Sequence, residues 1–178
     1  VVDPTTDKQA ALARAVELAK HNGAAITVFL SIFDFSYEMT SILSNIEREA
    51  MRQGVIEQRK AWLNDLLIPY SALGLSITTD VVWHNRPFES IIQHAIAGDY
   101  DLIVKGTHEH GKLKAVIFTP TDWHLMRKAP VPVLMVKDHD WPVSGKILCA
   151  VNVSTEDPDH QALNGKIIDY AKALASQF

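Results

Sequence analysis

The chain has 178 residues, enough for one domain and part of another, since domains usually contain about 100–150 residues. Its 47% hydrophobic and 21% charged residues are typical of a globular protein, and a formal net charge of −4 argues against a broad nucleic-acid-binding face. The single cysteine, Cys149, excludes an internal disulfide, and no apolar run approaches the roughly 20 residues of a membrane span. We therefore expect a cytoplasmic protein that binds no nucleic acid and does not span a membrane.

The first half of the chain alternates between helix and strand patterns. Apolar residues at intervals of three and four indicate helices, and short continuous apolar runs indicate buried strands. By these criteria we expect a helix over 6–22, a strand over 25–33, a helix over 44–67, a strand over 77–83 and a helix from Pro87. Gly23 suits the end of the first helix, because a helix C-terminus often needs a left-handed residue.

The second half continues the alternation. Thr119-Pro120-Thr121-Asp122 is a strong helix start, with a Thr cap, Pro at the first position and an acid three residues after the cap. The expected elements are a strand over 101–105, a helix over 120–128, a strand over 131–136, a strand over 147–153 and a helix over 161–175. The last two weakly repeat the pattern that opens the chain, which indicates a duplicated unit.

Strands and helices that alternate through short connections predict right-handed βαβ units. The expected fold class is α/β, with an open, mainly parallel five-stranded sheet and helices on both faces. In such folds ligands bind beyond the carboxyl ends of the strands. We expect one module over residues 1–140, then the first strand and helix of a second over 145–178. Residues 1–4 resemble the end of a strand and Phe178 ends an amphipathic helix, so we expect the chain to be cut at both ends.

Two segments resemble the universal stress protein family. Residues 101–108, DLIVKGTH, are similar to the entry of the family's glycine loop, and Leu113-Lys114 follows as in the family. Residues 129–136, APVPVLMV, are similar to the family's closing strand, A-P-x-P-V-x-x-V. The resemblance implies the family's adenine-nucleotide alpha hydrolase-like fold and a role in stress response. The tandem members of the family carry two such modules in one chain.

The glycine loop departs from the pattern of nucleotide-binding members, G-x-x-G, nine residues, then G-[ST]. Its first glycine corresponds to Gly106, but the second falls on Glu109, and the third with its Ser falls on Thr119 and Pro120. Such glycines let the backbone approach phosphate, and amides and a hydroxyl point at it. Pro120 has neither group, and Glu109 adds negative charge. The resemblance therefore implies a degenerate nucleotide cleft without a cofactor, with ATP disfavoured.

The cleft would be lined by residues at the strand ends and in the loop. They are Asp3, Ile32, Gly106, Thr107, Gly111, Thr119 and Thr121. Asp3 and Ile32 correspond to family residues that hold the nucleotide. For Asp3, a turn role in which it bonds nearby amides is an equal alternative. For Ile32, core packing is the favoured alternative.

Other chemistry finds little support in the sequence. Residues 106–113 resemble a phosphate-binding P-loop, but Leu113 stands where a Ser or Thr must hold Mg²⁺. His108, Glu109 and His110 lack further ligands at a spacing typical of a metal site. No nucleophile elbow or zinc-protease motif is present. We expect neither a metal site nor catalysis.

The leading hypothesis is a non-catalytic stress-response protein that acts by binding a ligand or a protein. Two alternatives stay open: an ATP-binding sensor or slow ATPase, and a carrier of an apolar small molecule in the vacated cleft. Glu109 and Pro120 separate the leading hypothesis from the first alternative. The expected partner is a second module of the same kind, or another chain in a dimer, bound through the sheet edge. A small-molecule ligand is the other partner considered.

Overall fold

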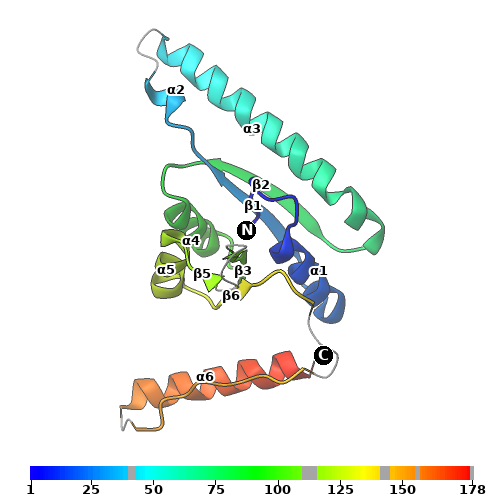
Figure 1. Ribbon diagram of the computed structural model, residues 1–178, viewed down its shortest axis with the longest axis vertical. Coiled ribbons are helices and arrows are strands. Elements are labelled where there is room, and N and C mark those ends of the chain that lie inside the picture. The colour runs from blue at the N-terminus through cyan, green and yellow to red at the C-terminus, as the bar shows by residue number, and fades with distance from the viewer. Residues whose placement is uncertain (40–42, 110–115, 141–144, 155–156, 177–178) are drawn as a thin grey trace. The chain divides into compact units, whose positions relative to one another are not determined.

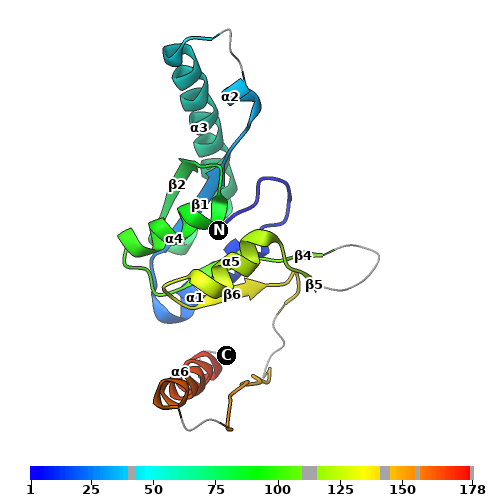
Figure 2. The same ribbon diagram turned by 90° about the vertical axis from the view of Figure 1, so that its left-hand side faces the viewer.

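The computed structural model describes residues 1–39, 43–109, 116–140, 145–154 and 157–176. They divide into two compact units, Val1–Asp138 and His139–Phe178 (Figures 1 and 2). Within the described ranges, no helix combines the length and the apolar character needed to cross a membrane.

The first unit alternates helices and strands as expected. Its elements are α1 (Ala10–Asn22), β1 (Ile26–Ile32), α2 (Ser36–Met39), α3 (Asn45–Leu67), the 3-10 helix η1 (Ile68–Leu73), β2 (Ile77–Trp83), α4 (Pro87–Ala97), β3 (Ile103–Gly106), β4 (His108–Glu109), β5 (Val116–Ile117), α5 (Pro120–Lys128) and β6 (Val133–Val136). The first helix begins four residues later than expected, because residues before Ala10 form a turn that the Gln9 side chain holds together. The short strands β4 and β5 were not expected.

The strands form three separate pairs in place of the expected five-stranded sheet. β1 pairs with β2 and β3 pairs with β6, both in parallel, while β4 and β5 are antiparallel. The two parallel pairs are linked by the opening residues of the chain. Val2 N donates to Phe29 O (3.1 Å) and Val1 N donates to Val104 O (2.7 Å). One such bond on each side does not make a continuous ladder, so this segment is not a β-strand.

Alternation along β1 sends its side chains to two cores. Val28 and Leu30 pack with residues of α1 and α3, including the completely buried Leu63. Phe29 points to the opposite face and packs with residues of α4 and with Leu125 of α5. Helices therefore cover both faces of the strands, as expected, with α3 on one side of β1 and β2 and α4 on the other (Figure 1).

The helix ends follow local sequence signals. Ser44 caps α3 in a capping box, in which Glu47 N donates to Ser44 Oγ (3.3 Å) and Ser44 N donates to Glu47 Oε2 (2.8 Å). Gly23 follows α1 in the left-handed conformation, at φ 71°. Pro87 occupies the first position of α4, where its missing N–H has no intrahelical role.

The second unit contains α6 (Pro158–Ala175), which includes the helix expected over 161–175. The strand expected over 147–153 is wrong, because these residues form no ladder. A strand needs a hydrogen-bonding neighbour, and none lies among the described residues of this unit. Instead, Asn152 N donates to Asn164 Oδ1 (3.1 Å) and Asn164 Nδ2 donates to Asn152 O (2.7 Å). Apolar side chains stay exposed here, Leu148 at 96% and Val153 at 86%.

Candidate functional site

The carboxyl ends of β3 and β6 hold two of the expected site residues. Gly106 ends β3 opposite Val136 of β6. Thr107 follows it, and its N–H (2.8 Å) and Oγ1 (3.2 Å) both donate to Val136 O. A Cβ at Gly106 would meet no atom within 4 Å, so the space above this backbone is open.

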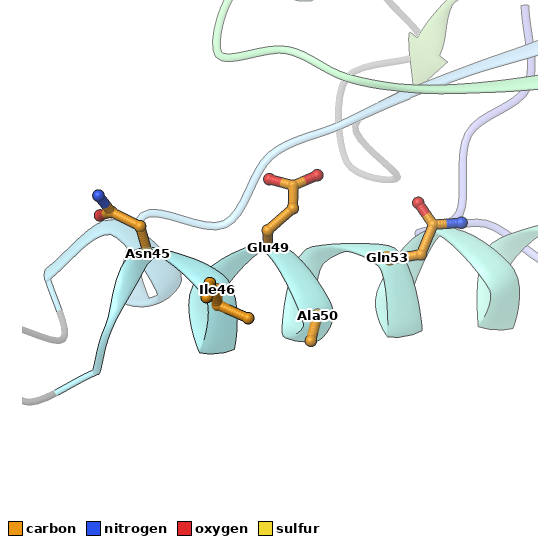
Figure 3. Close-up of a pocket in the computed structure, with 5 residues that line it drawn as sticks. All are labelled: Asn45, Ile46, Glu49, Ala50 and Gln53. Atoms are coloured by element: carbon orange, nitrogen blue, oxygen red, sulfur yellow. The ribbon is translucent and has the colours of Figure 1, made fainter.

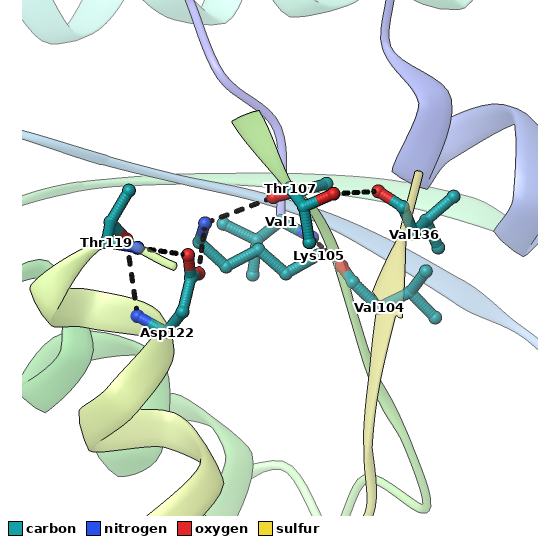
Figure 4. Close-up of polar contacts among 8 residues, drawn as sticks. Val1, Val104, Lys105, Thr107, Thr119, Asp122 and Val136 are labelled. Carbon is teal, nitrogen blue, oxygen red and sulfur yellow. Dashed lines mark hydrogen bonds and ion pairs between the residues drawn. The ribbon is translucent and has the colours of Figure 1, made fainter. Parts of the chain in front are cut away.

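A buried ion pair joins this strand end to α5. Lys105 Nζ lies 2.7 Å from Asp122 Oδ1 and donates to Gly106 O at 3.2 Å (Figure 4). The Asp122 side chain is completely buried and that of Lys105 is 12% exposed. A buried carboxylate is tolerated only when it is paired and hydrogen-bonded, so Lys105 supplies the charge that Asp122 requires.

The N-terminus of α5 is closed by the protein's own side chains. Thr119 N donates to Asp122 Oδ2 (2.7 Å), and Asp122 N donates to Thr119 Oγ1 (3.3 Å). Pro120 occupies the first helical position and carries no N–H. A helix N-terminus attracts anions through its amides and its dipole. Here the anion beside it is the carboxylate of Asp122, with Lys105 as the counter-charge.

The same group lies beside the opening of the chain. Val1 is half-buried, and its N donates to Val104 O (2.7 Å) close to Lys105 (Figure 4).

Asp3 and Ile32 have local structural roles. Asp3 Oδ1 accepts from Thr5 N (2.9 Å) and Thr5 Oγ1 (2.6 Å). This is the geometry of the turn role that was the alternative to nucleotide binding for Asp3. Ile32 ends β1, packs against the core, and its carbonyl accepts from His84 N (2.9 Å). The carbonyl of Ile32 is therefore already bonded to the β2 side of the sheet.

The remaining residues expected in the cleft lie in α5 or outside the described parts of the chain. Thr121 is half-buried in the first turn of α5, and Gly111 lies outside the described residues. The backbone of His108 and Glu109 forms β4, while residues 110–113, the second half of the P-loop-like stretch, also lie outside. In the part of the chain that is described, no three His, Cys, Asp or Glu side chains are placed to hold a metal ion.

The structure thus brings Gly106, Thr107 and Thr119 to one place around Lys105 and Asp122 (Figure 4). The sequence did not predict that Lys105 and Asp122 would form a buried ion pair here, because Asp122 was interpreted only as part of a helix start. A signal was present: Lys105 follows Leu102-Ile103-Val104 in a buried strand, and a cation there needs a partner.

A shallow, open hollow of about 430 Å³ lies elsewhere, along the first half of α3. It is lined by Asn45, Ile46, Glu49, Ala50 and Gln53. Figure 3 shows Glu49 and Gln53 on one side of the helix and Ile46 and Ala50 on another. All five residues belong to one helix, so the hollow is a feature of the α3 surface and does not coincide with the expected cleft.

Parallel strands covered by helices on both faces, with polar residues at the strand ends, define an α/β protein of the class that binds ligands beyond the strands. The model of the universal stress protein family matches residues 1–137, and the chain belongs to this family. Its members are named for the stress response. The family expected from residues 101–108 and 129–136 is confirmed.

The chain is similar to several proteins called universal stress protein E. It is 56% identical to those of Salmonella typhi and Escherichia coli K12 over 177 residues, covering 99% of this chain and 56% of each relative. The homolog from Haemophilus influenzae is 40% identical, with 98% of this chain and 58% of the relative covered. The chain therefore spans little more than half the length of these relatives.

Solved structures agree with the fold. A putative universal stress protein from Pseudomonas aeruginosa UCBPP-PA14 is 30% identical, with a TM-score of 0.74, covering 99% of this chain and 55% of that one. The universal stress protein UspA from Lactobacillus plantarum has a TM-score of 0.58 over 76% of this chain and 92% of its own. At 22% identity, that second likeness concerns the fold alone.

Proposed function

We propose that this protein is a non-catalytic, cytoplasmic stress-response protein that acts by binding a ligand or a protein, and that its phosphate site is degenerate. The observation that carries the proposal is the closed N-terminus of α5. There the Asp122 carboxylate accepts from Thr119 N and is paired with Lys105.

The charges at the N-terminus of α5 support the proposal that the phosphate site is degenerate. A triphosphate at the N-terminus of α5 would bring several negative charges beside the buried Asp122 carboxylate. The Coulomb repulsion between such groups grows as solvent is excluded from around them. Lys105, the cation at the strand end, is already neutralised at 2.7 Å by Asp122. The bound phosphate would meet a site whose charges are already balanced.

Hydrogen bonding supports it as well. A phosphate seated on this turn needs donors, but Thr119 N already donates to Asp122 and Pro120 has no N–H. Breaking the capping box would cost about 0.5–2 kcal/mol before any contact with the ligand formed. The nucleotide would therefore have to displace protein contacts in order to bind.

Isothermal titration with Mg-ATP tests the proposal. We expect no dissociation constant tighter than about 100 μM, which corresponds to roughly −5.5 kcal/mol. A variant that restores the family pattern, Glu109→Gly with Thr119→Gly and Pro120→Ser, should bind more tightly once Asp122→Ser also removes the internal carboxylate. The triple variant that keeps Asp122 is the matched control and should gain less. A micromolar constant for the unaltered chain, or ATP hydrolysis by it, would contradict the proposal.

We further propose that the two parallel pairs belong to one five-stranded sheet and that residues 145–178 open a second module. The bonds from Val1 and Val2 to β3 and β1 support the first part, because they lie between the two pairs. Exposed apolar residues of the second unit and the greater length of the relatives support the second part. The partner of that unit would be the rest of a second module, or another chain.

A further inference from the structure

Five polar side chains form a continuous chain on the face of β1 and β2 that α4 covers. His94 of α4 lies between Asp80 and Tyr100, with Nδ1 3.3 Å from Asp80 Oδ2 and Nε2 2.9 Å from the Tyr100 hydroxyl. The Tyr100 hydroxyl lies 2.9 Å from Thr27 Oγ1, which lies 3.1 Å from Thr78 Oγ1. The chain thus connects β1, β2, α4 and the turn that precedes β3.

The turn after α4 is shaped to place the Tyr100 ring. Gly98 follows α4, and its N–H donates to His94 O (3.0 Å). Asp99 is in the left-handed conformation, at φ 50°, and turns the chain back. The Tyr100 ring lies so close over Gly98 that a Cβ there would come within 2.3 Å of Tyr100 Cε2. Any residue other than glycine at position 98 would push the Tyr100 ring away from its position beside His94.

The imidazole is confined as well. Its ring lies 4.6 Å from the ring of Phe29 and 5.3 Å from that of Tyr100, measured between centroids. Its side chain is 27% exposed, so solvent protons can reach it. A neutral imidazole that takes up a proton changes from one donor and one acceptor to two donors.

The charged form of His94 orients the chain in one direction. Both ring nitrogens then carry protons, so Nδ1–H donates to Asp80 and Nε2–H donates to Tyr100. The Tyr100 hydroxyl donates to Thr27 Oγ1, and Thr27 donates to Thr78. The Thr78 hydroxyl turns to Ile26 O, at 3.5 Å.

The neutral form orients it in the other direction. An ionised carboxylate can only accept, so Nδ1 facing Asp80 keeps its proton, and Nε2 becomes an acceptor. Tyr100 must then donate to Nε2, which leaves its oxygen to accept from Thr27. Thr27 in turn accepts from Thr78. Each hydroxyl rotates, and no heavy atom has to move.

We propose that His94 and Tyr100 form a proton-dependent switch, in which uptake of one solvent proton at Nε2 of His94 reverses the hydrogen bonds from Tyr100 to Thr78. The switch carries the charge state of a helix residue to the beginnings of β1 and β2, and it joins Thr27 and Tyr100, which are 73 positions apart in the sequence. It shares no residue with the site at the ends of β3 and β6.

Other ionisable groups near α4 are placed differently. His124 and Lys128 of α5 lie against Phe88, at the opposite end of α4. Glu89 is paired with Arg86 at 2.8 Å. Asp99 and Asp101 in the turn after α4 are exposed. Asp80 and Tyr100 are the ionisable groups that contact His94 through its ring nitrogens.

Nuclear magnetic resonance of the labelled chain tests the switch. Nitrogen-15 shifts of His94 should show the Nδ1–H tautomer when the ring is neutral. The β-carbon shifts of Thr27 and Thr78 should change with pH along the same curve as His94. The β-carbon of Thr79, which faces the other core, should not follow that curve.

Two variants separate a connected chain from mere proximity. Tyr100→Phe keeps the ring and removes the hydroxyl, so His94 keeps its contacts with Phe29 and Asp80 while the response of Thr27 and Thr78 is lost. Gly98→Ala keeps every polar group but displaces the Tyr100 ring, so the response of Thr27 and Thr78 should again be lost. Tyr70→Phe removes a tyrosine hydroxyl elsewhere in the chain; it is the matched control and should leave the response intact. A neutral Nε2–H tautomer, no response in the unaltered chain, or a response that survives Tyr100→Phe would each overturn the proposal. The first two measurements need no variant.

Discussion

Replacing Lys105 by methionine would leave the Asp122 carboxylate in a completely buried position without its counter-charge. Lys105 Nζ lies 2.7 Å from Asp122 Oδ1, and the Asp122 side chain has 0% exposure. Removing one partner of a buried pair typically costs about 3–5 kcal/mol, because the other charge is left uncompensated. We expect about 3 kcal/mol from the low end of that range, since Asp122 keeps the hydrogen bond from Thr119 N.

Urea unfolding followed by circular dichroism measures this loss. With a slope of about 2 kcal/mol per molar urea, the midpoint should fall by about 1.5 M. Adding Asp122→Asn removes the second charge and keeps an oxygen that can accept from Thr119, so more than half of the loss should return. Lys8→Met is the matched control, because its pair with Asp138 is exposed at 80% and 54%; it should cost less than about 1 kcal/mol.

Two results would refute the reasoning. The first is a midpoint for Lys105→Met no lower than that for Lys8→Met, which would mean that solvent reaches Asp122. The second is a double variant whose loss equals the sum of the two single losses, which would mean that the two side chains are not coupled.

Two further expectations concern other parts of the chain. Hydrogen bonds from the Ser44 side chain, and then from its backbone, lower the pKa of Glu47 below its ordinary 4.5. A lowered carboxyl pKa adds stability above the ordinary value that is lost as pH falls through the folded value. Thermal unfolding should therefore show Glu47→Gln slightly less stable than the unaltered chain at pH 7 and equal to it well below that pKa; a difference that persists in acid would contradict this. In sedimentation velocity, exposed Leu148 and Leu163 of the second unit should make the sedimentation coefficient rise with concentration, and Leu148→Lys with Leu163→Lys should abolish the rise, whereas a monomer at every concentration would count against association.

Local signals in the sequence were sufficient for most helix ends. Thr119 and Asp122 form the expected capping box, Pro87 opens α4, and Gly23 is left-handed. Each depends on a side chain meeting backbone groups within a few residues, so the sequence neighbourhood contains both partners. The strand over 77–83 also matched its bounds, because the segment is rich in β-branched residues and lies between Gly74 and Pro87, which interrupt regular structure.

The strand expected over 147–153 shows where such local signals fail. Its apolar run resembles that of β1, yet these residues form no ladder. A strand is defined by bonds to a neighbour, and the sequence of one segment does not contain the neighbour. The division of the expected sheet into two parallel pairs has the same origin, since it depends on how many bonds Val1 and Val2 make to β3 and β1.

Family, order of elements and the loss of the glycine loop pattern could be read from residues alone, because periodicity, caps and motif spacing are properties of short stretches of chain. Only the tertiary structure determined which partners the residues at the strand ends contact. Lys105 meets Asp122 across 17 positions, and Tyr100 meets Thr27 across 73. Such pairs form because parallel strands and the helices between them return distant residues to the same edge or face. The charge balance at α5 and the polar chain at His94 are therefore consequences of packing, which no local pattern contains.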